Sequence, residues 1–278
     1  LSTVKAAGAR TVLVGDPEQY SAVKARSGLL ATLSEELPDA VELTEVFRQR
    51  SEKEREASTW LRSGDKGLIE RAAQWYADNN RVHAGSVTAM LDDALAGWAK
   101  DTARGKQSLL IASTREQVRA LNAAAQKTRA QRKELDLQQP HTRLSDGLES
   151  YIGDTILTRS NDYELVTSAG DVVRNGQRWM VESFTADGSA QVRRLDDTSA
   201  TVTLSSDYLR DSAQLGYAST GHSAQGATVD IARVVSGVGQ LDKASVYVPM
   251  TRGRDGNFLY ITEEQPGDSD TGHGKTRP

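Results

Sequence analysis

The feature that most constrains the fold of this chain is an alternation of short apolar runs with helical periodicity. Residues 11–14 form a β-branched and apolar run that ends in Gly15-Asp16-Pro17, which predicts a buried strand that stops at a loop. A second buried strand is predicted at 108–112, and a helical pattern follows it directly. Between residues 51 and 106, apolar residues spaced in threes and fours predict helices. This alternation indicates an open α/β sheet with mostly parallel strands.

A different pattern interrupts this alternation between residues 149 and 205, where short β-rich runs are divided by turn signals. The turns that carry glycine are Ser168-Ala169-Gly170, Asn175-Gly176 and Ala186-Asp187-Gly188. The α/β pattern then resumes, with strands predicted at 229–235 and 258–262 and a helix around 243–251. We therefore expect a small β-barrel inserted into the α/β domain.

Composition limits the class of protein. The 278 residues, 37% hydrophobic and 26% charged, leave room for one large domain or two smaller ones. The absence of cysteine excludes disulfides and thiolate metal sites, which fits a reducing compartment. No apolar run approaches the roughly 18 residues of a membrane span, and no signal peptide begins the chain, so the cytoplasm is the expected location. A net charge of −4 gives no overall signature of nucleic-acid binding.

Polar and charged residues gather in four segments that resemble motifs III, IV, V and VI of superfamily 1 helicases, in the RecD-like branch. The segments are Gly15–Gln19, Leu43–Gln49, Tyr217–Gly226 and Tyr247–Arg254. Further stretches resemble the helicase portion of TraI/TrwC-type conjugative relaxases, namely residues 109–122, 151–162, 172–182 and 217–230. The resemblance runs from about residue 11 to residue 262. It implies a RecA-like parallel sheet domain, the second motor domain of a P-loop NTPase fold, with an inserted SH3-like β-barrel.

The pattern and the resemblance together predict a division of the chain into five segments. Residues 1–36 are expected to be the remnant of a first RecA-like domain, and residues 37–148 the first part of the second one. The SH3-like barrel is expected at 149–205, and the second part of the second RecA-like domain at 206–262. Residues 263–278 are polar and glycine-rich, which predicts a disordered tail.

Three residues are candidates for catalysis of phosphoryl transfer. Charge on a γ-phosphate must be stabilised in the transition state, and planar guanidinium groups suit this task, so we expect it of Arg48 and Arg252. In the family, such arginines reach across a cleft to nucleotide held mainly by the first motor domain; the alternative for each is an ordinary surface ion pair. The amide of Gln19 can sense the terminal phosphate or the attacking water, whereas Asp16 is expected to fix the loop. The resemblance also assigns Gly226 to the nucleotide site.

Candidates for DNA binding lie in the third segment and after the strand at 108–112. Hydroxyl, amide and backbone N–H groups can hold a DNA phosphate, and the segment supplies them at Thr220, His222, Ser223 and Gln225. We expect His222 to contact DNA or another domain, not a metal. Past the strand end, the candidates are Thr114 and Arg115.

Two further features leave alternatives open. Basic residues between Arg104 and Lys133 form either a stripe that follows a nucleic-acid backbone or a solvated helix face. The aromatic residues of the insertion can stack on bases or fill its core. We expect stacking at most from Tyr163, and core positions for Trp179 and Phe184.

Other elements of a complete helicase are missing from the sequence. Neither a Walker A loop nor a Walker B carboxylate pair precedes Gly15. The tail contains Gly274-Lys275-Thr276, but a P-loop requires a glycine five positions before Gly274, where Ser269 stands. The four histidines are scattered, with no metal triad, so we predict no metal site and no relaxase-type DNA nicking.

Two functional hypotheses follow. In the first, the chain is the C-terminal fragment of an ATP-dependent DNA helicase, which we expect to be inactive alone because it lacks a Walker A loop and a Walker B pair. ATP and Mg²⁺ are expected to bind in the complete enzyme, and no cofactor is expected for this chain by itself. Its expected partners are single-stranded DNA and the missing N-terminal motor domain of the same protein, with no membrane, and the resemblance implies 5′ to 3′ travel. In the second, the chain is a truncated, non-catalytic module that binds single-stranded DNA. A decayed fragment without function is a third possibility.

Overall fold

The α/β part of the molecule is built on a five-stranded parallel sheet. A computed structural model describes residues 46–263 without a break, and before them residues 4, 6–9, 12–16, 19, 20, 32, 33, 36, 37, 40 and 41. The strand order is β1-β14-β13-β2-β12, and all neighbours are parallel. The strands are β1 (Val82–Gly85), β2 (Ser108–Ala112), β12 (Ala218–Thr220), β13 (Val229–Gly237) and β14 (Gly253–Thr262). The parallel α/β sheet predicted from the alternation is confirmed.

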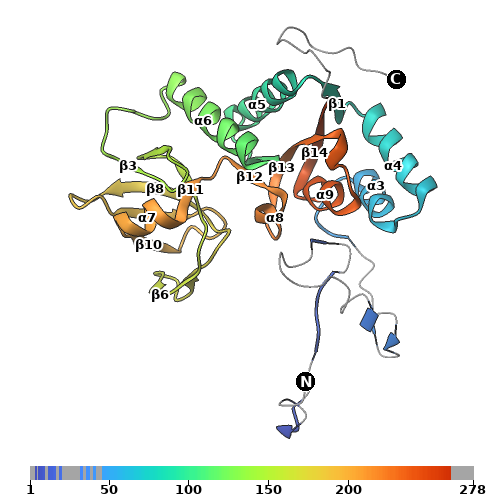
Figure 1. Cartoon of the computed structure of the whole chain (residues 1–278), viewed down its shortest axis with the longest axis horizontal. Helices are drawn as coiled ribbons and strands as arrows, with labels where there is room; N and C mark the ends of the chain where they lie inside the picture. Colours follow the sequence, from blue (N-terminus) through green and yellow to red (C-terminus); the bar gives the residue numbers. More distant parts are fainter. Residues whose placement is uncertain are drawn as a thin grey trace.

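Helices cover both faces of this sheet (Figure 1). The helices are α3 (Glu52–Ser63), α4 (Lys66–Asp78), α5 (Val87–Ala103), α6 (Arg115–Gln131), α8 (Gly221–Ala224) and α9 (Lys243–Tyr247), with 3-10 turns η1 (Val238–Gln240) and η2 (Pro249–Thr251). All five residues of β2 are buried because its side chains alternate between two cores. Leu110 faces Trp98 and Leu121 of α5 and α6, whereas Leu109 packs with Tyr76 of α4.

The helices begin where short polar side chains accept backbone N–H groups that would otherwise lack a partner. Ser51 accepts from Glu54 N before α3, and Asp65 accepts from Leu68 N at 2.9 Å before α4. Helix α3 ends at Gly64, which takes the left-handed conformation with φ +74°. These caps define where α3 and α4 begin. The two helices pack on the face of the sheet that carries Leu109.

The predicted insertion is a small antiparallel β-structure whose five-stranded sheet has the order β10-β9-β8-β5-β11. Its elements are β3 (His141–Arg143), β4 (Glu149–Tyr151), β5 (Thr155–Thr158), β6 (Asp162–Val166), β7 (Val172–Val173), β8 (Arg178–Phe184), β9 (Ala190–Arg194), β10 (Thr201–Leu204), α7 (Ser206–Ser212) and β11 (Ala213–Leu215). Gly176 and Gly188 have φ of +90° and +81° at two predicted turns. The prediction of an SH3-like barrel is confirmed, although pairing of β11 with β5 carries the sheet past residue 205. The five segment boundaries themselves stay a prediction.

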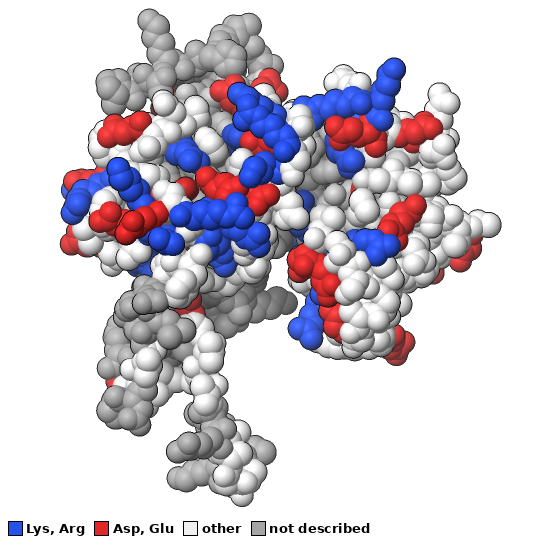
Figure 2. All heavy atoms as spheres, turned by 180° about the vertical axis from the view of Figure 1, so that it is seen from behind, with Lys and Arg blue, Asp and Glu red and all other residues white. Residues whose placement is uncertain are grey.

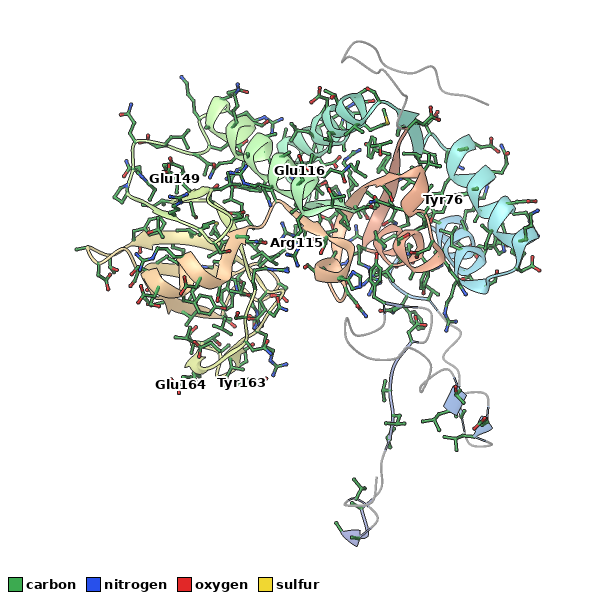
Figure 3. All side chains as sticks on the ribbon, viewed as in Figure 1. Tyr76, Arg115, Glu116, Glu149, Tyr163 and Glu164 are labelled. Atoms are coloured by element: carbon green, nitrogen blue, oxygen red, sulfur yellow. The ribbon has the colours of Figure 1, made fainter. Side chains whose placement is uncertain are left out.

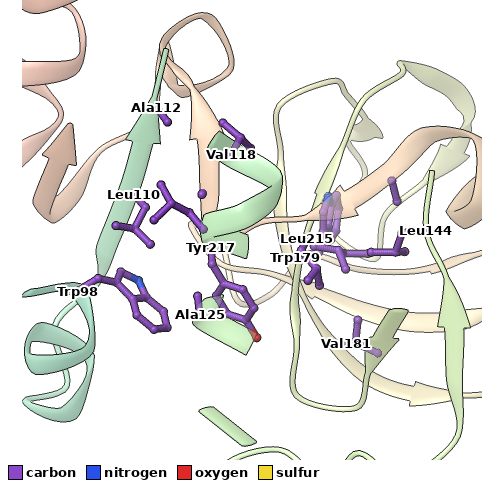
Figure 4. Packing of buried hydrophobic residues seen from close by; sticks show 14 of the residues in the cluster. Trp98, Leu110, Ala112, Val118, Ala125, Leu144, Trp179, Val181, Leu215 and Tyr217 are labelled. Atoms are coloured by element: carbon purple, nitrogen blue, oxygen red, sulfur yellow. The ribbon is translucent and has the colours of Figure 1, made fainter. Parts of the chain in front are cut away.

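The aromatic residues of the barrel divide as predicted between core and surface. Trp179 is fully buried, and Phe184 is partly buried against the same core. Tyr163 is 73% exposed and lies on the projecting β6 hairpin (Figure 3). Figure 4 shows the barrel core around Trp179 continuing into the α/β core through Leu215 and Tyr217. One hydrophobic cluster therefore joins the barrel to the sheet.

The strand predicted at 11–14 is wrong for the part that the structure describes. Val12, Leu13 and Val14 are not in a strand and are 80%, 54% and 89% exposed. Apolar runs form strands only when neighbouring strands satisfy their backbone groups, and no strand among the described residues pairs with this run. Most of the predicted first segment and residues 264–278 of the predicted tail lie outside the described residues. Within the described part, no helix combines the length and apolar character needed to cross a bilayer.

Candidate nucleotide and nucleic-acid site

Residues of all four motif-like segments meet beside α8, α9 and η2. The Arg48 Nη1 donates to the Thr251 carbonyl at 3.0 Å, which joins the second and fourth segments. The Gln225 amide donates to Gln19 Oε1 at 3.3 Å, which joins the first and third. Residues separated by about two hundred positions in sequence thus form one site.

The first segment is organised around Asp16. Its carboxylate accepts from Gln19 Nε2 at 3.0 Å and lies 3.6 Å from the guanidinium of Arg62 on α3. A backbone bond from Gln19 N to Asp16 O at 3.2 Å closes the turn. The contacts agree with the expectation that Asp16 fixes the loop. Both ends of the Gln19 amide are engaged, by Asp16 and by Gln225, so Gln19 connects the first segment to the third.

Arg252 is almost completely buried, with 2% of its surface exposed. Its Nε donates to the Val248 carbonyl at 2.7 Å, and its Nη2 donates to Thr251 Oγ1 at 2.9 Å. Both acceptors are neutral. Burial, with the charge of Arg48 added, lowers the pKa of Arg252 to about 10.

Arg48 is half-buried, and burial lowers the pKa of its guanidinium as well. Among the described residues, no carboxylate forms an ion pair with Arg48 or Arg252. The carboxylate of Asp16 acts on Arg252 from beyond ion-pair distance and partly offsets the lowering of its pKa. Two neighbouring cations partly removed from water and without a direct ion pair are an unfavourable arrangement that an anion would relieve. The pair can therefore bind a phosphate group. Tyr247 lies beside both arginines, and burial raises the pKa of its hydroxyl.

The third segment forms a tight loop around α8. Thr220 caps this short helix and accepts from Ser223 N at 3.4 Å. The ring of His222 stacks on Tyr20 with centroids 4.0 Å apart. A Cβ at position 221 would overlap the Tyr20 hydroxyl, so glycine is required for this approach. His222 therefore contacts the residue that directly follows the first segment, and burial raises the pKa of Tyr20 to about 12.

Other predicted residues of the site take separate positions. Gly226 follows α8 with φ +87°, a conformation that glycine adopts without strain, and no atom of the residues that the structure describes would crowd a Cβ there. Thr114 caps α6 in a capping box with Gln117, whose N donates to Thr114 Oγ1 at 3.1 Å. Arg115 is exposed at the start of α6, on the side toward α8 and the barrel (Figure 3). Thr114 and Arg115 thus flank the loop and do not touch the buried arginines.

Much of the basic stripe between Arg104 and Lys133 is engaged within the molecule. Arg132 Nη2 donates to the Ala99 carbonyl at 2.7 Å, and Arg129 Nη1 donates to the Tyr217 hydroxyl at 2.9 Å. Lys106 forms an ion pair with Asp255 at 2.8 Å. Figure 2 shows Lys and Arg interleaved with Asp and Glu on one face of the molecule. These contacts favour the reading as a structural, solvated surface.

Sequence reasoning did not single out Tyr20 and Arg159. The one sequence feature that could have pointed to Tyr20 is its position directly after Gln19. Arg159 follows β5 of the barrel, and its Nη1 donates to Ser223 Oγ. Nothing in the sequence indicates this contact, because the two residues lie 64 positions apart. Among the described residues, no group of three or more His, Asp and Glu is placed to hold a metal ion.

Comparison with known proteins gives matches along nearly the whole chain. A family model described as an AAA domain matches residues 1–87, and the Rv2311 SH3-like barrel domain matches residues 145–214. The conjugal transfer protein TraA of Agrobacterium fabrum is 32% identical over 264 residues, which are 94% of this chain and 22% of that protein. A probable TraA of Sinorhizobium fredii is 30% identical with the same coverage. The chain thus spans about a fifth of the length of these relatives.

A shorter relative and a solved structure are also similar to parts of this chain. The uncharacterized protein Rv2311 of Mycobacterium tuberculosis is 39% identical over 101 residues, which are 36% of this chain and 57% of that protein. A crystal structure of the Pif1 helicase from Bacteroides, in complex with ADP-AlF3 and ssDNA, aligns with a TM-score of 0.45 at 15% identity. The alignment covers 79% of this chain and 51% of that one.

Proposed function

We propose that this chain, which belongs with the C-terminal motor part of superfamily 1 helicases as found in conjugative relaxases, completes an ATPase site and couples it to single-stranded DNA. The observation that carries the proposal is the pair of arginines Arg48 and Arg252 without a described carboxylate partner. Guanidinium groups held in this way stabilise the charge that develops on a transferred phosphoryl group.

The nucleotide itself would be held mainly by a P-loop from another segment of the protein, because this sequence contains no Walker A loop. Mg²⁺ would neutralise phosphate charge in the complete enzyme, on carboxylates outside the residues described. Within this chain, Arg48 and Arg252 bind the terminal phosphate, and Gln19 orients the attacking water.

Coupling to DNA would pass through two contacts that the third segment makes with Gln19 and with the next residue, Tyr20. The Gln225–Gln19 hydrogen bond and the Tyr20–His222 stack join the phosphate-sensing turn to the loop at Thr220–Gly226. A change at the phosphate therefore moves the loop that we expect to bind DNA. Translocation in the 5′ to 3′ direction is part of the proposal and rests on the resemblance alone.

The test is DNA-stimulated ATP hydrolysis by the longer protein that contains this chain together with a Walker A segment. We expect Arg252→Ala and Arg48→Ala each to lower kcat about 10³-fold or more, as loss of a phosphate-stabilising arginine does in related chemistry. Arg193→Ala, which removes a barrel arginine paired with Glu182, is the matched control and should leave kcat unchanged. Because Arg252 is buried, circular dichroism must show that the variant folds; Arg48 is half-buried and provides the second arm. Full activity in both folded variants contradicts the assigned role.

A second candidate function is a non-catalytic module that binds single-stranded DNA. The observation in its favour is the group of polar and basic residues around α8, where Ser223 Oγ bonds to Arg159 Nη1 and to Thr220 Oγ1. Fluorescence anisotropy of labelled oligo-dT with this chain alone, over a salt series, tests it. Binding by the chain without ATPase activity of the longer protein would favour the module, and absence of binding at low salt would exclude it.

A further inference from the structure

The two arginines of the candidate phosphate site stand on segments that lie side by side, one before α3 and one that leads into β14. Arg48 Nη1 donates to the Thr251 carbonyl at 3.0 Å. Further along both segments, Arg50 N donates to the Arg254 carbonyl at 2.8 Å. The placement of Arg252 relative to Arg48 therefore depends on what holds these two segments together.

A fully buried pair of side chains, Glu54 and Asn257, closes the junction between the segments. Glu54 lies in the first turn of α3, and its Oε1 accepts from Asn257 N at 3.0 Å and from Asn257 Nδ2 at 2.8 Å. The Asn257 amide in turn grips the backbone of Gly253: its Oδ1 accepts from Gly253 N at 2.7 Å, and its Nδ2 donates to the Gly253 carbonyl at 3.2 Å. Gly253 directly follows Arg252, so a chain of hydrogen bonds runs from α3 to the residue beside the arginine.

The turn after Arg252 leaves no room for a side chain at Gly253. A Cβ at this position would lie 2.2 Å from the Gly256 carbonyl oxygen and 2.9 Å from Asn257 Oδ1, so glycine is required. The Arg252 carbonyl accepts from Val229 N at 3.1 Å, which ties the arginine backbone to β13. The backbone that carries Arg252 is thus held from β13 and, through Asn257, from α3.

Glu54 is a costly residue for a purely structural contact. Its carboxylate is fully buried and forms no ion pair with any cation that the structure describes. Its second oxygen, Oε2, has no hydrogen-bond partner among the described residues. A buried charge of this kind lowers stability, whereas hydrogen bonds to a charged oxygen are stronger than neutral ones and hold their donors firmly. The contact therefore contributes a fixed geometry more than it contributes stability.

We propose that Glu54 and Asn257 are positioning residues of the phosphoryl-transfer site, which hold the turn at Gly253 and thereby fix the Arg252 guanidinium relative to that of Arg48. Neither residue contacts the phosphate itself. A displacement of about 1 Å in a catalytic group can cost about 10²-fold in rate, so a contact outside the site can control its activity. The inference rests on the proposed function in taking ATP hydrolysis as the reaction that the two arginines serve.

DNA-stimulated ATP hydrolysis by the longer protein, which supplies the Walker A segment, tests this role. We expect Asn257→Ala and Glu54→Leu each to lower kcat about 10²-fold. The KM for ATP should change by less than about twofold, because the P-loop holds most of the nucleotide and the arginines act in the transition state. Glu54→Gln is the conservative variant: it keeps an acceptor oxygen for both Asn257 donors, so its kcat should stay within about twofold of the wild type.

A double-mutant cycle with Arg252→Ala separates positioning from a general structural effect. If Asn257 acts through Arg252, Asn257→Ala lowers kcat no further once the arginine is absent, whereas independent losses multiply. Thr142→Val is the matched control, because it removes another buried hydrogen bond to backbone, from Thr142 Oγ1 to the Gly188 carbonyl at 2.9 Å. Thr142 lies on β3 of the barrel, across the molecule from α9 (Figure 1), so its variant should keep the kcat of the wild type.

Circular dichroism identifies the variants that fold, and Glu54→Leu carries the test if Asn257→Ala does not fold. A folded variant with the kcat of the wild type, or with a loss that multiplies with that of Arg252→Ala, would overturn the positioning role and leave the proposed function standing. A kcat in Glu54→Gln as low as that in Glu54→Leu would contradict positioning through these hydrogen bonds. An Arg252→Ala variant that keeps full activity would overturn the proposed function and the positioning role with it.

Discussion

Two buried arginines of the α/β domain show how a structural cation differs from one placed for a ligand. Arg233 is 7% exposed and forms a bidentate pair with Asp101, with N–O distances of 2.7 and 3.0 Å. Arg252 is buried more deeply, yet its side chain donates to a carbonyl and a hydroxyl. A buried charge without a counterion is costly to the fold. Arg233 has a counterion and Arg252 has no direct one, so the cost of burying a charge remains at Arg252, where an anionic ligand can offset it.

This contrast leads to a prediction about stability. Asp101→Asn leaves Arg233 buried without its counterion, so we expect a loss of about 3–5 kcal/mol in the free energy of unfolding. Arg252→Met replaces a buried charge that forms no ion pair with a described carboxylate by an apolar side chain of similar length, and we expect a change of less than about 1.5 kcal/mol. Urea denaturation followed by circular dichroism measures both. A loss in Arg252→Met as large as that in Asp101→Asn would mean that Arg252 has a structural role.

At the residue scale, the sequence indicates which residues belong to the candidate site better than it indicates which residues they contact. Arg48, Arg252 and Gln19 were chosen because residue types and order resemble known motifs, and the structure brings their segments together. The Tyr20–His222 stack and the Arg159–Ser223 bond were not predictable. Such contacts depend on how distant segments approach, which local patterns do not encode.

At the scale of elements, buried apolar runs predicted strands well where the sheet supplies partners. Residues 108–112 and 229–235 form central strands of the parallel sheet, paired along most of their length. The run at 12–14 is also apolar, but no strand among the described residues pairs with it. Strand β11 was missed because Ala213–Leu215 is too short to show a period, and its pairing with β5 defines it. Pairing is a property of the fold, so it limits prediction from local sequence.

The connection between barrel and sheet depends on a buried polar group of side chains. The Tyr217 hydroxyl donates to Asp154 and accepts from Arg129 Nη1 at 2.9 Å. Asp154 is fully buried and also accepts from Gln126 Nε2 at 2.6 Å and from Tyr151 N at 2.7 Å. Burial raises the pKa of the Asp154 carboxyl. The group fixes the start of β5 against α6 and against the residues that lead through β12 to the loop around α8.

Tyr217→Phe should therefore destabilise the protein without altering its apolar packing. Removal of the hydroxyl leaves Asp154 and Arg129 each without one partner, at a cost of about 1–3 kcal/mol. Tyr208→Phe is the control, because its hydroxyl bonds to the Ser160 carbonyl near the surface and its loss should cost less than about 0.5 kcal/mol. Chemical denaturation of both variants gives the comparison. Equal losses in the free energy of unfolding for the two substitutions would show that the buried hydrogen bonds of Tyr217 stabilise the fold no more than the surface bond of Tyr208.

At the scale of the whole molecule, the barrel and the sheet share one hydrophobic cluster. The cluster includes Trp179 and Val181 from the barrel and Trp98, Leu110 and Leu121 from the α/β domain. Proteins divided into independent domains have separate cores joined by linkers. The shared cluster instead predicts that barrel and sheet unfold together, so that damage to one is felt by the other.

Trp179→Ala tests this coupling, because the side chain is fully buried in the barrel and far in sequence from the helices of the α/β domain. Loss of a buried tryptophan costs about 3–5 kcal/mol. The longest helices, α3 to α6, all belong to the α/β part, so ellipticity at about 222 nm reports mainly on that part. If unfolding is cooperative, the thermal midpoint of this helical signal falls along with that of the barrel, in a single transition. Tyr163→Ala, at a residue 73% exposed, should leave the midpoint unchanged. A helical transition that keeps its midpoint in Trp179→Ala would show that the barrel unfolds on its own, and the shared cluster would then not couple the two parts.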